Sequence, residues 1–210
     1  MAAAEPATVP IATTAPPWLV VIDMQVIFGE PGSAWFTPGY AEIEPRVAAL
    51  VQGFGERVIF TRFVAPQHPV GAWKPYYEQW PFAMVAPDDR LYDLMPNLPR
   101  GQHPVVTRTT FSKWGDELAS LLGPEPTIVL AGVSTDCCVL STALGAADAG
   151  ARVIVVSDAC AGLSEADHER ALAAMALYAP LIEIADAATV LAATVLGPTV
   201  TGPTVLAASA

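Results

Sequence analysis

Short apolar runs alternate with amphipathic stretches along this chain. The run WLVVI at residues 18–22 is rich in β-branched side chains, which is typical of a buried parallel strand. Residues 42–54 instead carry apolar side chains at helical spacing and predict a helix. The other predicted strands are 58–64, 104–108, 127–132, 152–159 and 181–186, and the other predicted helices are 115–122, 135–149, 164–177 and a last one after residue 186.

This alternation predicts an α/β fold, in which a doubly wound, mostly parallel six-stranded sheet has helices on both faces. We expect the strand order 3-2-1-4-5-6, which reverses between the first and fourth strands. Ligands bind beyond the carboxyl ends of strands at such a reversal. Asp23 follows the first strand and the turn 132–138 follows the fourth, so we expect both at the site.

A single domain is expected over residues 17–196, because no internal repeat is present. The ends, 1–16 and 197–210, contain several prolines and are predicted to be tails. Residues 65–104 form a long stretch with many prolines and aromatic residues. Loops of this length in compact domains are usually lids or binding loops.

Composition excludes several function classes. The net charge of −11, with only 10 basic residues, argues against a nucleic-acid partner. No apolar run suggests a membrane span, and the first residues do not resemble a signal peptide. Three cysteines, two of them adjacent, make no disulfide framework, so a reducing cytoplasm is expected.

The turn 132–138, with the sequence GVSTDCC, puts a thiol in the first turn of a helix. A helix N-terminus lowers a thiol pKa and stabilises an oxyanion. Adjacent cysteines lie about 100° apart on a helix, so only one of Cys137 and Cys138 can face a site. Two interpretations remain open here, a nucleophile or two small core residues. Asp23, alone, is equally a solvated carboxylate or a base.

Four segments in order resemble the motifs of the isochorismatase-like cysteine hydrolases: VIDMQ, VVTR with TTFSKW, AGVSTDCCV and VIVVSDACAG. The resemblance covers residues 17–192. It implies an Asp–Lys–Cys triad, with the aspartate at Asp23 and the cysteine at Cys138 rather than Cys137. It also implies a cis peptide at Val133–Ser134 and an oxyanion hole formed by the N–H groups of Ser134 and Cys138.

The chain departs from this family pattern at the lysine, whose position holds Arg108. Arginine can keep Asp23 ionised but cannot release a proton. We therefore expect Arg108 to be the catalytic cation, and we expect Lys113, five residues later, to be solvated. The histidines that accompany metal in the nicotinamidases of this superfamily have no counterpart here, so no metal and no cofactor are predicted. His168 is expected to be structural, whereas His68 is either solvated or near substrate.

Aromatic residues gather in segments expected beyond the carboxyl ends of the strands. They line a substrate pocket or a subunit interface, and the two alternatives are about equal. Oligomers of this superfamily often let one subunit cover the pocket of another, so a homo-oligomer, dimer or tetramer, is expected. The candidate substrate-binding residues are Phe28, Trp35, Trp73, Tyr76, Trp80 and Trp114.

The sequence thus predicts a cysteine hydrolase that cleaves a C–N bond of a small amide, lactam, ureide or carbamoyl compound through a thioester. Two alternatives stay open. One is vinyl-ether hydrolysis of an isochorismate-like compound, against which the thiol argues because that chemistry needs acid catalysis. The other is a non-catalytic scaffold of the same fold, for which Arg108 at the lysine position is the only support.

Overall fold

The computed structural model describes residues 15–196, so nearly all of the two expected tails lies outside the described residues. Six strands form one sheet in the order β3-β2-β1-β4-β5-β6, and every neighbouring pair is parallel. The predicted fold class and strand order are therefore confirmed. The strands are β1 (Trp18–Ile22), β2 (Val58–Phe63), β3 (Val105–Arg108), β4 (Thr127–Val133), β5 (Arg152–Ala161) and β6 (Ile182–Ala185).

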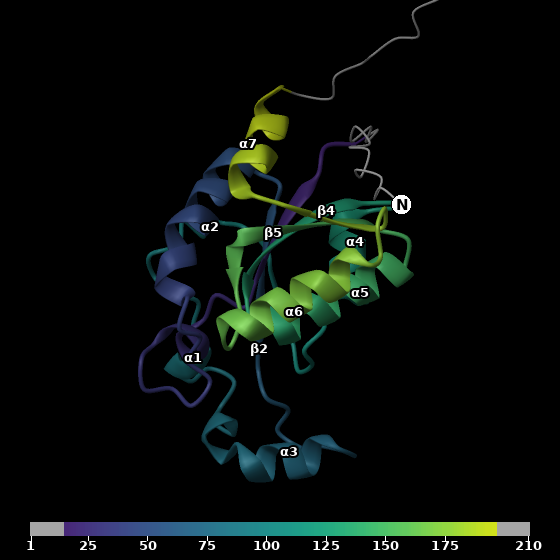
Figure 1. Cartoon of the computed structure of the whole chain (residues 1–210). Coiled ribbons are helices and arrows are strands. Elements are labelled where there is room, and N and C mark those ends of the chain that lie inside the picture. Colours follow the sequence, from purple (N-terminus) through teal and green to yellow (C-terminus); the bar gives the residue numbers. More distant parts are fainter. Residues whose placement is uncertain (1–14, 197–210) are drawn as a thin grey trace, which may run out of the picture.

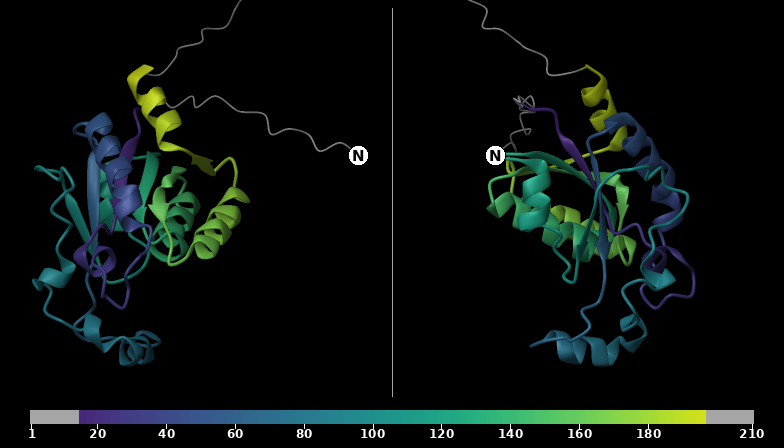
Figure 2. Two further views of the ribbon diagram at one scale, coloured as in Figure 1. Left: turned by 60° about the vertical axis from the view of Figure 1, so that its left-hand side comes forward. Right: turned by 180° about the vertical axis from the view of Figure 1, so that it is seen from behind.

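Helices cover both faces of the sheet (Figures 1 and 2). On one face lie α2 (Tyr40–Phe54) and α7 (Ala187–Leu196), and on the other α4 (Asp116–Leu122), α5 (Leu140–Asp148) and α6 (Glu165–Ala176). The apolar strands bury both faces, which gives one core cluster on each side of the sheet. Ser164 caps α6 by accepting a hydrogen bond from the Asp167 amide.

The expected helix over 135–149 is divided in two. Thr135–Val139 form a π-helical turn, and the regular helix α5 begins only at Leu140. Single π turns of this kind often occur at functional sites. Cys138 therefore lies in a wide turn ahead of the helix, and the amphipathic spacing of the sequence could not distinguish this turn from regular helix.

The long segment 65–104 is largely irregular, as predicted, but includes the short helix α3 (Trp73–Gln79) and two 3₁₀ turns, Pro81–Ala83 and Arg90–Tyr92. It extends beyond one end of the sheet, and α3 is its outermost part (Figure 1). The side chain of Gln25, just before α1 (Val26–Gly29), fastens this segment: its amide donates to the carbonyls of Phe63 and Tyr92 and accepts from the Phe63 amide.

A glycine brings the ends of β1 and β4 into close contact. Gly132 pairs with Ile22 and has a φ of +119°, and a Cβ there would lie 2.1 Å from the Ile22 carbonyl oxygen. Only glycine tolerates both conditions without strain. The close approach brings Asp23, directly after β1, beside the turn that follows β4. Among the described residues no helix is long and apolar enough to cross a bilayer.

Candidate active site

Asp23 directly follows β1 in a left-handed conformation, with a φ of +47°, and is fully buried. Its amide donates to the Thr61 hydroxyl at 3.1 Å, and this hydroxyl donates back to Oδ1 at 2.6 Å. Oδ2 has no well-aligned hydrogen-bond donor among the described residues. One carboxylate oxygen is thus fixed in place, while the other keeps a lone pair that can accept a proton.

Lys113 is the cation that faces this carboxylate. Its Nζ lies 2.8 Å from Asp23 Oδ2, and both side chains are fully buried. Nζ also donates to the Thr110 carbonyl at 2.7 Å and lies 5.1 Å from the ring centroid of Phe63. The expectation that Lys113 is solvated is therefore wrong. The segment between β3 and α4 folds back over the sheet end and carries the lysine inward.

Arg108 lies elsewhere, although the sequence assigned it the catalytic cation. Within residues 15–196 it forms no ion pair with Asp23 or with any other carboxylate. Its guanidinium packs against the backbone of Gly115, where a Cβ would lie 2.5 Å from Nη1. Lys113 occupies the place beside Asp23 that was predicted for Arg108.

Cys138 is buried and belongs to the core cluster on the α5 side of the sheet. Cys137 is only partly buried, and its thiol points to the Asp136 carboxylate at 3.5 Å. The two neighbours thus face different surroundings, as their spacing predicts. The preceding Val133–Ser134 peptide bond is cis, and the Ser134 carbonyl accepts the amides of Cys137 and Val139.

Burial raises the pKa of the Cys138 thiol well above its ordinary value. Lys113 opposes this by lowering the thiol pKa, whereas the negative charge of Asp23 raises it further. The resting thiol is therefore protonated and has a carboxylate as its neighbour. Burial, and then Asp136, raise the pKa of Cys137 to about 11, so Cys137 is not an activated thiol either.

Thr142 joins the two candidate catalytic segments. Its buried hydroxyl accepts the Lys113 amide at 2.9 Å and donates to the Cys138 carbonyl at 2.7 Å. In the same way, the Thr61 hydroxyl holds Asp23 through its amide and its Oδ1. Sequence reasoning missed both threonines, because strand register and the fold of the β3–α4 segment decide their contacts. The sequence did contain a signal that points to Lys113 as the family's lysine: the chain has only two lysines, and the other, Lys74, lies in the long segment 65–104.

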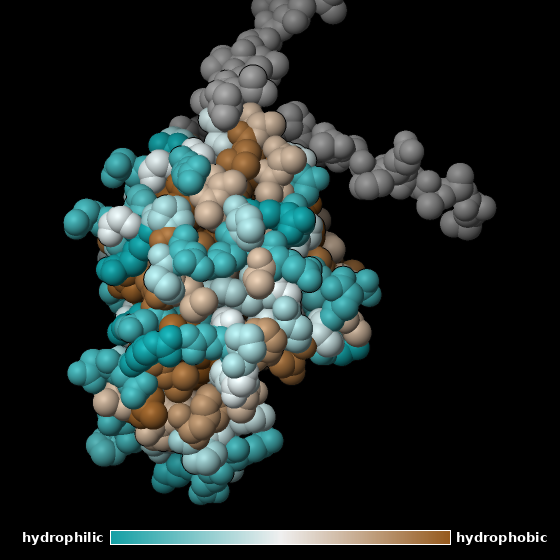
Figure 3. All heavy atoms as spheres, turned by 90° about the vertical axis from the view of Figure 1, so that its left-hand side faces the viewer, coloured by the Kyte–Doolittle hydropathy of each residue, from teal (hydrophilic) through white to brown (hydrophobic). Residues whose placement is uncertain are grey.

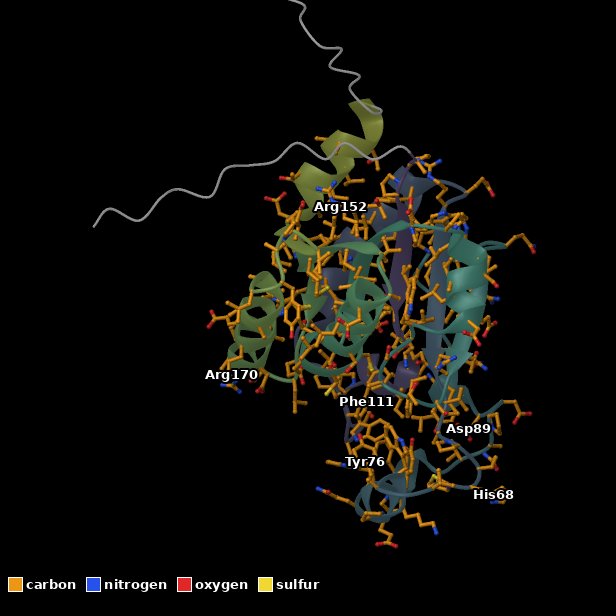
Figure 4. The ribbon with its side chains drawn as sticks, turned by 90° about the vertical axis from the view of Figure 1, so that its right-hand side faces the viewer. His68, Tyr76, Asp89, Phe111, Arg152 and Arg170 are labelled. Atoms are coloured by element: carbon orange, nitrogen blue, oxygen red, sulfur yellow. The ribbon has the colours of Figure 1, made fainter. Side chains whose placement is uncertain are left out.

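Five of the six predicted substrate-binding residues form one connected aromatic cluster. Trp35 is central, with ring centroids 6.0–6.1 Å from those of Phe28, Tyr76 and Trp80. Trp73 joins through Tyr76 at 5.3 Å. Figure 4 shows Tyr76 of α3 facing Phe111 from the β3–α4 segment, and their centroids are 5.9 Å apart.

Tyr76 connects this aromatic cluster to the thiols. Burial raises the pKa of Tyr76 to about 12, and the charges of the nearby Cys137 and Cys138 add to this effect. Trp114, the sixth predicted residue, lies apart: it packs near Gly145 of α5, in the core cluster on that face. Apolar surface also collects at the end of the molecule that carries α3, at the bottom of Figure 3. Val70 and Met84, both in the segment 65–104, are exposed.

The histidines do not join the candidate site. His168 contacts the Thr135 hydroxyl through Nδ1 at 2.8 Å, which ties α6 to the π turn. His68 is exposed on the protruding segment, away from Tyr76 and Phe111 (Figure 4). Within the part of the chain that the structure describes, no group of three or more His, Cys, Asp or Glu side chains is arranged to hold a metal ion.

Comparisons with known proteins bear on the family and the fold of this chain. The model of the isochorismatase domain matches residues 17–186. Isochorismatase domain-containing protein 2 of Xenopus laevis is 31% identical over 160 residues, which are 75% of this chain but only 66% of that protein. The chain therefore spans just under two thirds of the length of this relative.

Solved structures share the fold. A cysteine hydrolase from Pseudomonas syringae has a TM-score of 0.74 at 23% identity, with 84% of this chain and 91% of that one covered. A pyrazinamidase of Pyrococcus horikoshii, solved in complex with zinc, has a TM-score of 0.65 at 26% identity, with 81% and 98% covered.

Proposed function

The chain belongs to the isochorismatase-like hydrolase family, and from this premise we propose that it is a cysteine-dependent amidohydrolase with Cys138 as its nucleophile. The observation that carries the proposal is the buried Asp23–Lys113 pair next to the Cys138 thiol. A paired, desolvated carboxylate beside a protonated thiol has the constellation of a base and a nucleophile. The proposed substrate is a small amide, lactam, ureide or carbamoyl compound.

In the first half-reaction, Asp23 Oδ2 accepts the proton of the Cys138 thiol. The thiolate attacks the substrate carbonyl carbon, and the carbonyl π electrons move to its oxygen. As the tetrahedral adduct collapses, the C–N bond breaks and Asp23 returns its proton to the leaving nitrogen. The products are a free amine or ammonia and a thioester on Cys138.

In the second half-reaction, Asp23, again ionised, takes a proton from water. The hydroxide formed attacks the thioester carbonyl, and the C–S bond breaks. The proton passes from Asp23 to the sulfur, so the acid product leaves and the thiol is restored. We assign the oxyanion to the backbone N–H groups of Ser134 and Cys138, at the start of the π turn, where preorganised donors stabilise developing charge.

Lys113 rather than Arg108 is our candidate for the catalytic lysine. The 2.8 Å contact keeps a positive charge next to Asp23 as the carboxylate gains and loses its proton. Lys113 also lowers the pKa of the Cys138 thiol and so favours the attacking thiolate. The only sequence support for a non-catalytic scaffold was the missing lysine, and a buried lysine at the aspartate removes that support.

The aromatic cluster of Phe28, Trp35, Trp73, Tyr76 and Trp80 is the proposed wall of the substrate pocket. Its Tyr76 hydroxyl lies close enough to Cys137 and Cys138 for these two residues to raise its pKa. Nothing in the surroundings of Trp114 supports its assignment to the pocket. The homo-oligomer and the cytoplasmic location remain predictions from the sequence.

The test is a screen of small amides, ureides and carbamoyl compounds for release of ammonia or amine by the purified protein. Cys138→Ala is expected to abolish release, whereas Cys137→Ala, its neighbour and matched control, retains most of it. Isochorismate consumption is measured in parallel. Undiminished turnover by Cys138→Ala, or consumption of isochorismate alone, would overturn the proposal.

A further inference from the structure

A cavity of about 520 Å³ lies on the other side of the sheet from the Asp23–Thr61 contact. It opens against β2 and β3, and residues 93–100 of the long segment form its outer wall. Arg62 follows Thr61 on β2, and successive strand residues point to opposite faces. Because Thr61 contacts Asp23, Arg62 faces this cavity from the opposite side of the strand. The volume is in the range of pockets for small molecules.

The polar lining of the cavity is mainly cationic. Arg62 pairs in register with Thr107 of β3, so a guanidinium and a hydroxyl project side by side from neighbouring strands. Arg100 adds a second guanidinium from the outer wall. Asp93 is the one carboxylate in the lining, and the rest is apolar, including Leu98 and Val105.

These two arginines lie together without a carboxylate partner in an acidic protein. The net charge is −11, and five of the ten basic side chains form ion pairs within the described residues. Arg62 and Arg100 form none there, yet they line the same cavity. The Nε of Arg62 is buried and has no hydrogen-bond partner among residues 15–196. A buried, unsatisfied donor on a charged group is costly unless a ligand satisfies it.

The outer wall is held in place by backbone contacts. The Val26 amide donates to the Asp93 carbonyl and the Met95 amide to the Met24 carbonyl, each at 2.9 Å, and Gln25 forms a bridge with Leu94. The wall is thus attached to the segment that follows β1. A cavity fixed before binding costs its ligand little ordering entropy.

We propose that this cavity binds a small organic anion, a carboxylate or phosphate group on an apolar skeleton. Arg62 and Arg100 contact the anionic group, and Thr107 donates a hydroxyl hydrogen bond. Leu98 and Val105 contact the skeleton. Guanidinium groups suit this task because their planar array of donors matches carboxylate and phosphate oxygens. The site is separate from Cys138, so it does not depend on the proposed function.

The test is calorimetric titration of the Cys138→Ala protein, which keeps the cavity but removes the proposed nucleophile. The probes are phenyl phosphate and benzoate, which carry both chemical features, inorganic phosphate, which lacks the skeleton, and phenol, which lacks the charge. We expect one of the two organic anions to bind, inorganic phosphate to bind more weakly, and phenol not to bind. The bound anion identifies which group the cavity prefers.

Substitutions of the lining residues test whether the anion binds in this cavity. Arg62→Gln and Arg100→Gln should each weaken binding about tenfold or more, because each removes a charge-assisted contact. Asp93→Asn should strengthen it several-fold, since it removes the only negative charge in the lining. Arg170→Gln is the control and should change nothing, because this exposed arginine belongs to α6, which packs against β5 and β6 rather than against β2 and β3. The proposal is overturned if neither organic anion binds, or if the affinity is the same in the Arg62→Gln and Arg170→Gln proteins.

Discussion

Replacing Lys113 with methionine should destabilise the protein far more than an ordinary lysine substitution. Lys113 and Asp23 are both fully buried, and their charged atoms are 2.8 Å apart. Methionine fills a similar space but leaves the carboxylate without its counter-charge. Asp23 is then a buried anion without a neighbouring cation to compensate its charge.

The magnitude follows from the burial of the pair. Removing one partner of a buried ion pair costs about 3–5 kcal/mol, whereas replacing both partners by neutral groups is often close to neutral. For a chain of this size, each kcal/mol moves the melting temperature by about 2–4 °C. Lys113→Met should therefore lower it by about 6–20 °C. Asp23→Asn should also be destabilising, and asparagine tolerates the positive φ of this position.

The assay is a double-mutant cycle measured by urea denaturation. The Asp23→Asn/Lys113→Met protein should be at least about 2 kcal/mol more stable than the sum of the two single losses predicts. Arg108→Met is the matched control, because Arg108 is only partly buried and forms no ion pair in the described chain. It should cost less than about 1.5 kcal/mol. Additive losses, or a larger loss for Arg108→Met than for Lys113→Met, would refute the assignment of Lys113.

Three further outcomes follow from the site. Iodoacetamide should alkylate Cys138 slowly at neutral pH and faster in alkaline solution, because burial raises the pKa of its thiol. Asp23→Asn removes a negative charge that raises this pKa, so the alkylation profile should move to lower pH while turnover is lost; a shift to higher pH would contradict this. Thr142→Val removes the hydroxyl that joins Lys113 to Cys138, so it should lower the unfolding free energy by about 1–3 kcal/mol and kcat about tenfold. Thr142→Ser keeps the hydroxyl and should restore both quantities; a serine variant as impaired as the valine variant would show that the hydroxyl is not the cause. Gly132→Ala should lower the unfolding free energy, measured by urea denaturation, by about 2–3 kcal/mol. Gly55 also has a positive φ but has open space around it, so Gly55→Ala should cost clearly less; equal losses would exclude the close contact with Ile22 as the cause.

The sequence predicted the sheet well because its signals are local. The strand at 18–22 and its counterpart at 127–132 are apolar on both faces, and this pattern occurs in parallel sheets with helices on both sides. Strand order followed from the general preference for one doubly wound topology. The position of Asp23 beside the turn with Cys138 followed from that order, since strand ends at a reversal lie together.

The catalytic cation could not be predicted in the same way. Arg108 is the last residue of β3, and it matched the spacing of a motif. Lys113 lies in an irregular segment, and the path of that segment depends on tertiary contacts such as the Lys113 amide to Thr142. Thr61 was hidden for a related reason: its contact with Asp23 depends on the register between β1 and β2. Sequence spacing predicts elements better than it predicts contacts between irregular segments.

Mass spectrometry of protein quenched with acid during turnover of an amide found in the screen tests whether Cys138 forms a covalent intermediate. We expect an added mass equal to the acyl group of that substrate, located on the Cys138 peptide and removed by hydroxylamine, as for a thioester. The Cys138→Ala protein should carry no such adduct, and Cys137→Ala should carry it unchanged. Turnover without any adduct on Cys138, together with full activity of Cys138→Ala, would exclude Cys138 as the nucleophile.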